Sequence, residues 1–323
     1  MSPERQGAAP VPQGVPSQGG LRAPAGTACF ALADPKTAVF AASACLPWPA
    51  LGQASGPGDA FRARFAPGSG WCAAALCCGR PGDSQAGRHS AEAAEAAVGL
   101  FLGTAAASDV FKAYEGNREL FKEWRRCFAE DPESSGGPER EGQCRQALPL
   151  GPIVARAFGE PFGKKARACS AFMFAAALKL PVCWIIVTLR SGPGEAAVLG
   201  AMVPGGKACP PLLSRPCGGA SGPAALAGPE AAGRARVSLP VSFEGVILAG
   251  EGAMAAWFPE RGGAAGAAAW GAFWNGDLKG SAPALFEPSA PLPSRAEALA
   301  GSLAAAGAGR GPARAGLAAA VIR

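Results

Sequence analysis

Residues 168–189 read ACSAFMFAAALKLPVCWIIVTL and are almost entirely apolar. A membrane-spanning helix needs roughly 20 apolar residues with few charges. Lys179 and Pro181 interrupt this stretch, and a lysine at the centre of a spanning helix costs about 2.5–3.5 kcal/mol. A buried helix over 162–180 followed by a buried strand over 181–189 accounts for the same residues without that cost. We therefore expect a protein core here and keep a membrane-associated protein that uses 168–189 as an alternative.

The residues before this stretch contain strand patterns followed by helix patterns. Apolar runs at 28–33 and 37–45, together with the alternating apolar and basic segment 61–65, predict an antiparallel β-meander. Helices are predicted over 90–102 and over 108–128, and in the second of these apolar residues recur every three or four positions.

Polar and glycine-rich segments divide the chain, and the predicted fold class is α+β. The predicted organisation is a disordered arm over 1–26, a β-meander with helices over 27–130, a linker over 131–149, a second α+β unit with further strands over 150–288 that contains a long loop at 204–234, and a low-complexity tail over 289–323.

Charge and cysteine content limit the classes of partner and compartment. The formal net charge is +6 over 323 residues, which permits nucleic-acid binding but does not indicate it. The 11 cysteines are odd in number and include no Cys-x-x-Cys pair, so we expect free thiols and no metal site. Because free thiols are typical of a reducing compartment, the predicted location is the cytoplasm or the nucleus.

Two glycine motifs fit the G-x-G-x-x-A pattern of a dinucleotide-binding turn, at 192–197 and at 250–255. The chain contains 46 glycines and is rich in alanine, so such strings arise by chance. No cofactor is therefore predicted. A small nucleotide- or dinucleotide-binding enzyme that uses these turns remains an alternative.

Few residues are available for catalysis. His89 is the single histidine, and no G-x-S-x-G nucleophile motif occurs. We therefore predict a protein that is not an enzyme: a non-enzymatic interaction or assembly protein, structural or scaffold in kind, of which a virion tegument-type component of a large GC-rich DNA virus is one form. A protein partner is expected, and its predicted binding surface is a late aromatic group, Trp257, Phe258, Trp270, Phe273 and Trp274.

Overall fold

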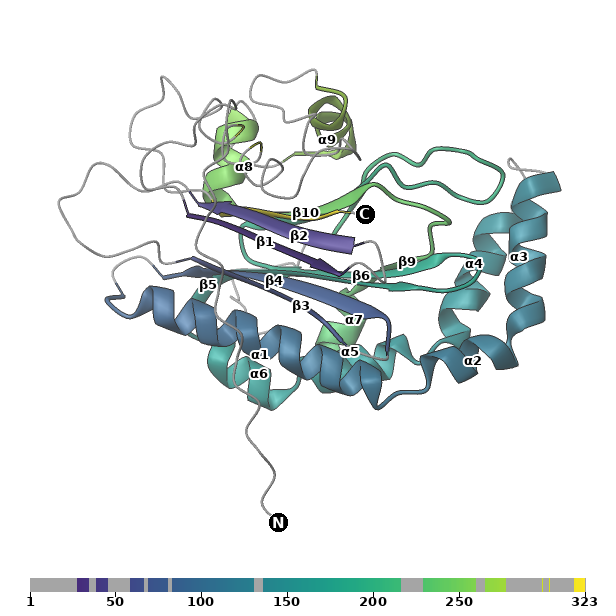
Figure 1. Cartoon of the computed structure of the whole chain (residues 1–323), viewed down its shortest axis with the longest axis horizontal. Helices are drawn as coiled ribbons and strands as arrows, with labels where there is room; N and C mark the ends of the chain where they lie inside the picture. The colour runs from purple at the N-terminus through teal and green to yellow at the C-terminus, as the bar shows by residue number, and fades with distance from the viewer. Residues whose placement is uncertain are drawn as a thin grey trace, which may run out of the picture.

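The computed structural model describes residues 28–34, 39–45, 59–66, 69–80, 83–130, 136–215, 229–259, 265–276, 298, 302 and 317–322. The predicted arm over 1–26 and most of the predicted tail over 289–323 lie outside these residues. Within them, the chain forms two antiparallel β-sheets with helices on both outer faces (Figure 1).

The described strands pair only with antiparallel neighbours. Sheet A contains, in spatial order, β1 (Ala28–Asp34), β2 (Val39–Cys45), β11 (Leu317–Ile322), β10 (Gly245–Gly250), β7 (Gly194–Leu199) and β8 (Leu212–Leu213). Sheet B contains, again in spatial order, β3 (Ala60–Phe65), β4 (Trp71–Gly79), β5 (Cys169–Lys179), β6 (Trp184–Ser191) and β9 (Arg236–Ser238). These sheets and the helices that cover them confirm the predicted α+β class.

Helices cover the outer faces of the two sheets and one side of the sandwich (Figure 1). Sheet B is covered by α1 (Ala86–Ala106), α5 (Leu150–Ala157), α6 (Glu160–Ala166) and α7 (Pro229–Arg234), and sheet A by α8 (Glu251–Trp257) and α9 (Ala267–Trp274). At one side lie α2 (Val110–Gly116), α3 (Arg118–Glu130) and α4 (Gly136–Ala147). Separate apolar clusters fill the space under the sheet B helices, between the sheets, and under α8 and α9.

The central strand β5 corrects the predicted helix over 162–180. Phe172 and Phe174 face the helices that cover sheet B, whereas Met173 and Ala175 face sheet A. Because both faces of this strand are buried, its sequence is apolar at almost every position and has no two-residue alternation. Only the first part of the prediction is helical, as α6. The buried strand predicted over 181–189 is confirmed by β6.

The segment predicted as a linker, 131–149, contains helix α4. It also does not separate two independent sheets, because β4 and β5 pair directly across it, with Ala74 opposite Ala175. Polar and glycine residues dominate α4, which explains why its sequence resembles a linker. An ion pair between Arg140 of α4 and Glu123 of α3, at 3.0 Å, joins the two helices. Likewise, the helix predicted over 108–128 is two helices, α2 and α3, which meet at Asn117.

The apolar stretch 168–189 forms the strands β5 and β6 and not a helix. Among the described helices, none is by itself long and apolar enough to cross a membrane, although α1 and α2 together satisfy length and composition with a bend of 44° between them.

Candidate functional site

The turn between β6 and β7 carries the chain from sheet B to sheet A. Gly192 and Gly194 have backbone φ angles of 80° and 138°, which residues with a side chain rarely adopt. A Cβ atom on Gly192 would lie 2.5 Å from the carbonyl oxygen of Ser170, and one on Gly194 would lie 2.7 Å from that of Ala249. The glycines at 192–197 therefore allow a tight turn between strands, and they do not lead from a strand into a helix as a dinucleotide-binding turn does.

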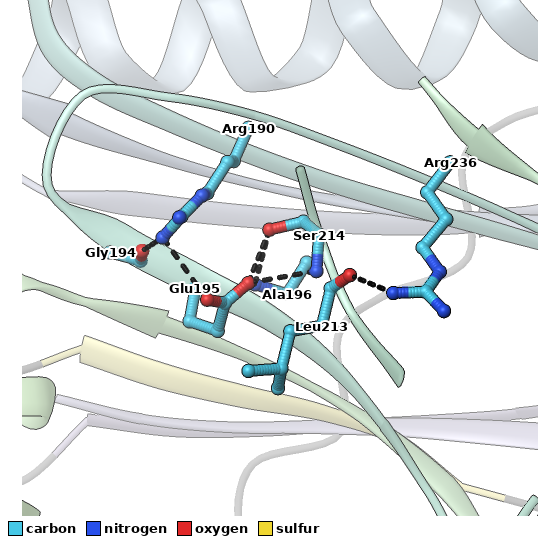
Figure 2. Close-up of polar contacts among 7 residues, drawn as sticks. All are labelled: Arg190, Gly194, Glu195, Ala196, Leu213, Ser214 and Arg236. Atoms are coloured by element: carbon cyan, nitrogen blue, oxygen red, sulfur yellow. Dashed lines mark hydrogen bonds and ion pairs between the residues drawn. The ribbon is translucent and has the colours of Figure 1, made fainter. Parts of the chain in front are cut away.

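This turn positions a buried ion pair (Figure 2). The Glu195 side chain is almost fully buried, and its Oε2 lies 3.1 Å from Nη1 of Arg190. The same Nη1 donates a hydrogen bond of 2.6 Å to the carbonyl oxygen of Gly194. Burial raises the pKa of Glu195, and the charge of Arg190 acts in the opposite direction.

The other carboxylate oxygen of Glu195 holds the chain segment that follows β8. Its Oε1 accepts hydrogen bonds from the backbone N–H groups of Ala196 at 2.9 Å and Ser214 at 3.0 Å, and from the Ser214 hydroxyl. These bonds fix the end of β8, where the carbonyl oxygen of Leu213 accepts a 2.8 Å hydrogen bond from Nη1 of Arg236 on β9 (Figure 2). A continuous polar network therefore runs from the turn to Arg236.

Arg236 forms part of the wall of a pocket of about 210 Å³, which we call the edge pocket. It lies where an edge strand of each sheet, β8 of sheet A and β9 of sheet B, approaches α4. The walls include Glu141 and Arg145 of α4, Cys209, Leu212 of β8, and Arg236 and Val237 of β9. The edge pocket thus brings together charged side chains from segments far apart in the sequence.

Positive charge exceeds negative charge around the edge pocket. Nη1 of Arg145 donates a 3.2 Å hydrogen bond to the carbonyl oxygen of Val237, and its Nε lies 3.9 Å from Oε1 of Glu141. Burial, followed by the charges of Arg215 and Arg145, lowers the pKa of Arg236. Because a guanidinium has five N–H donors and stays protonated in proteins, Arg145 and Arg236 keep donors for a further acceptor.

The sequence pointed to a different surface. The structure places four of the five predicted partner-binding rings, Trp257, Phe258, Trp270 and Phe273, in the buried cluster between sheet A and the helices α8 and α9, while Trp274 packs against it partly buried. Trp257 also donates a 2.9 Å hydrogen bond to the hydroxyl of Ser302. These rings form core and not the partner surface that we predicted. The sequence could not distinguish the two roles, because their helical spacing suits either one.

The second glycine motif, 250–255, does lead from a strand into a helix, β10 into α8. However, β10 pairs antiparallel with both of its neighbours, β7 and β11, whereas a dinucleotide-binding fold uses parallel strands. The structure therefore does not provide the sheet that the nucleotide-enzyme alternative requires.

No protein-family model and no curated protein sequence matches the chain. Solved structures resemble it at low identity. Serine-threonine phosphatase 2C from Toxoplasma gondii is 14% identical with a TM-score of 0.47, and the match covers 92% of this chain and 98% of that one. RsbX in complex with magnesium is 8% identical with a TM-score of 0.42, covering 88% and 96%. The catalytic domain of the serine threonine protein phosphatase PstP in complex with 2 manganese ions is 13% identical with a TM-score of 0.36, covering 88% and 99%.

This comparison corrects two predictions. The comparison contradicts the prediction of a non-enzymatic interaction or assembly protein, including the tegument-type component, because the similar structures include named phosphatases. The same finding contradicts the expectation that the chain is not an enzyme, although these matches show no activity of this chain. Because these TM-scores are below 0.5, no residue role or ligand is transferred from those proteins to this chain.

Magnesium and manganese occur in two of those structures, so we tested whether this chain could hold such an ion. The described residues contain no group of three or more His, Cys, Asp and Glu side chains that could do so. Near the start of α8, Asp59 and Cys78 lie together, but Asp59 accepts a 3.2 Å hydrogen bond from the N–H of Gly79, and burial raises the pKa of Cys78. A protonated thiol is a poor ligand for cations that prefer oxygen. In the described part of the chain, the donors do not fit either ion.

The cysteines agree with the sequence prediction of free thiols. The eight cysteines whose side chains the structure describes are all free: Cys72, Cys77, Cys78, Cys127, Cys144, Cys169, Cys183 and Cys209. The residues of the edge pocket were not predicted as a site, since Glu141 and Arg145 lie in the predicted linker and Arg236 follows the predicted long loop. The spacing of Glu141 and Arg145, four residues apart, was the one local signal that they share a helix face.

Proposed function

We propose that this chain binds a small anionic ligand, a phosphate monoester or a carboxylate, in the edge pocket between α4, β8 and β9. The observation that supports the proposal is the convergence of Arg145 and Arg236 on one pocket, with Arg215 close enough for its charge to act on Arg236. An anion that binds between positively charged side chains held close together is attracted to all of them.

Arginine suits this role by its geometry as well as its charge. The planar guanidinium matches the oxygen spacing of phosphate and carboxylate and forms two parallel hydrogen bonds with either. Arg236 is held from one side by the carbonyl oxygen of Leu213, and Arg145 by that of Val237. Both side chains are therefore ordered before a ligand arrives, which reduces the entropy lost on binding.

The size of the pocket limits the ligand. Sites for drug-sized molecules and cofactors are usually about 300–1,000 Å³. At about 210 Å³, the edge pocket suits a single phosphorylated or carboxylated group, and it is too small for a dinucleotide. The apolar wall residues Leu212 and Val237 leave room for a short carbon chain beside the anion.

Isothermal titration calorimetry with inorganic phosphate and with O-phosphoserine tests the proposal. Removing one charge-assisted hydrogen bond costs about 1.5–3 kcal/mol, so Arg236→Gln and Arg145→Gln should each weaken binding by about 10- to 150-fold. Arg156→Gln is the matched control, because Arg156 is exposed on α5 and does not line the edge pocket. It should bind as the unaltered chain does.

Absence of saturable binding for both ligands, or equal binding by the chain with Arg236→Gln, would refute the proposal. The same samples are assayed for released inorganic phosphate, because hydrolysis of O-phosphoserine would make the ligand a substrate. Raising the salt concentration should weaken binding, since screening reduces the attraction between the arginines and the anion.

A further inference from the structure

We propose that Glu141 couples anion binding in the edge pocket to the uptake of a proton, so that the anion is bound while the Glu141 side chain is neutral. This inference rests on the proposed function, because it concerns how the same pocket is regulated. It would make the affinity of the pocket for an anion fall as the pH rises.

Glu141 occupies the same pocket wall as the arginines that would bind the ligand. It lies one helical turn before Arg145 on α4, and Oε1 is 3.9 Å from Nε of that arginine. The backbone N–H of Leu239 donates a hydrogen bond to its carboxylate, and the charge of Arg236 also acts on it. When ionised, Glu141 is therefore an internal anion that interacts with both of the guanidinium groups a ligand needs.

The other titratable groups around Glu141 do not replace it in this role. The charge of Glu141 acts on three thiols: Cys209 across the pocket, Cys144 on α4 and Cys183 just before β6. Burial raises the pKa of all three. They remain uncharged at neutral pH. Among the pocket walls, Glu141 is thus the carboxylate that faces the arginines at 145 and 236. The charges of Arg215 and of Glu195, which is itself paired with Arg190, also act on Arg236, in opposite directions.

A second anion cannot enter a space of about 210 Å³ without repulsion from an ionised Glu141. Neutralising that carboxylate removes the repulsion and frees the guanidinium of Arg145 from its ion pair. Burial already raises the pKa of Glu141 above that of an ordinary glutamic acid, and a bound anion would raise it further. By linkage, an anion that raises the affinity for a proton has its own affinity raised equally by that proton.

The direction of the pH dependence follows from the two protonation states. Below the raised pKa, Glu141 is neutral and the anion meets two arginines without a competing charge on Glu141, so binding is strongest. As the pH rises through that pKa the carboxylate ionises and binding weakens, and well above it binding reaches a weaker plateau. Glu141→Gln should keep the tight binding at every pH, because glutamine has a shape similar to that of glutamic acid and no charge.

Sulfate is the probe for this experiment, because it stays a dianion across the whole range from about pH 5 to pH 8, whereas phosphate itself titrates there. Calorimetric titrations of the full chain in two buffers with different ionisation enthalpies give the number of protons taken up with each sulfate. We expect net proton uptake for the unaltered chain and none for Glu141→Gln. At the upper end of the range, Glu141→Gln should bind sulfate at least about tenfold more tightly.

Glu139→Gln is the matched control, since Glu139 is an exposed residue of the same helix that does not line the pocket. It should keep both the proton uptake and the pH dependence. Sulfate binding that depends on Arg236 but shows no proton uptake, with no gain for Glu141→Gln, would overturn this inference and leave the proposed function intact. Sulfate binding that is absent from the unaltered chain and from Glu141→Gln would overturn both.

Discussion

Replacement of Gly192 by alanine tests how tightly the chain is confined where it passes from sheet B to sheet A. The residue has a φ of 80°, and the left-handed conformation costs a residue with a side chain roughly 1–2 kcal/mol. In addition, the new methyl group would lie 2.5 Å from the backbone oxygen of Ser170 and 2.9 Å from Cα of Ala171. Neither backbone atom can rotate away, and overpacking of this kind costs roughly 1–3 kcal/mol. Gly192→Ala should therefore lower the free energy of unfolding by about 2–5 kcal/mol.

Gly206→Ala separates the two contributions. Gly206 has almost the same φ, 78°, but a Cβ atom there would meet nothing within 4 Å. Urea unfolding followed by tryptophan fluorescence gives the free energy of each variant from its midpoint and slope. Gly206→Ala should lose only the conformational part, about 1–2 kcal/mol. Equal losses in the two variants would refute the argument that the backbone of β5 confines the turn.

Three further predictions concern the buried groups. Glu195→Ala should lower the free energy of unfolding by about 3–5 kcal/mol in urea titrations, because Arg190 would be left without its partner carboxylate; a loss under about 1 kcal/mol would indicate a solvated pair. Trp270→Ala should cost about 3–5 kcal/mol in the same assay, since the ring is fully buried, and an unchanged midpoint would instead place the ring at a surface. Alkylation by iodoacetamide at pH 8, mapped by mass spectrometry, should reach the partly exposed Cys127 well before Cys183, which is buried and has its pKa raised to about 12; equal rates would contradict the burial of Cys183.

The sequence predicted those elements whose pattern differs from that of their surroundings. The strand over 181–189 is bounded by Pro181 and by a glycine turn, and it is present as β6. The strand β5 was missed because it is covered on both faces, so its residues have no alternation that distinguishes a strand from a buried helix. Which faces are covered depends on the arrangement of both sheets, and no local pattern contains that information.

The candidate site could not be predicted for a related reason. Arg145 and the carbonyl oxygen of Val237 that it contacts are 92 residues apart in the chain. Glu141 and Arg145 looked like the solvated charges of a linker, and Arg236 like an isolated basic residue after a loop. Only the pairing of β9 with β6, and of β8 with β7, brings these segments to the same edge of the sandwich.

The hydrogen bond from Arg236 to Leu213 joins a strand of one sheet to a strand of the other. It therefore depends on how the two sheets are aligned, since a displacement of one residue along a strand moves a group by about 3.3 Å, more than the length of the bond itself. A ligand held by Arg236 and by wall residues of β8 would act as a clamp between the layers. The affinity for that ligand would then depend on the alignment of the two sheets. A substitution far from the pocket that lets the sheets shift relative to each other would lower this affinity.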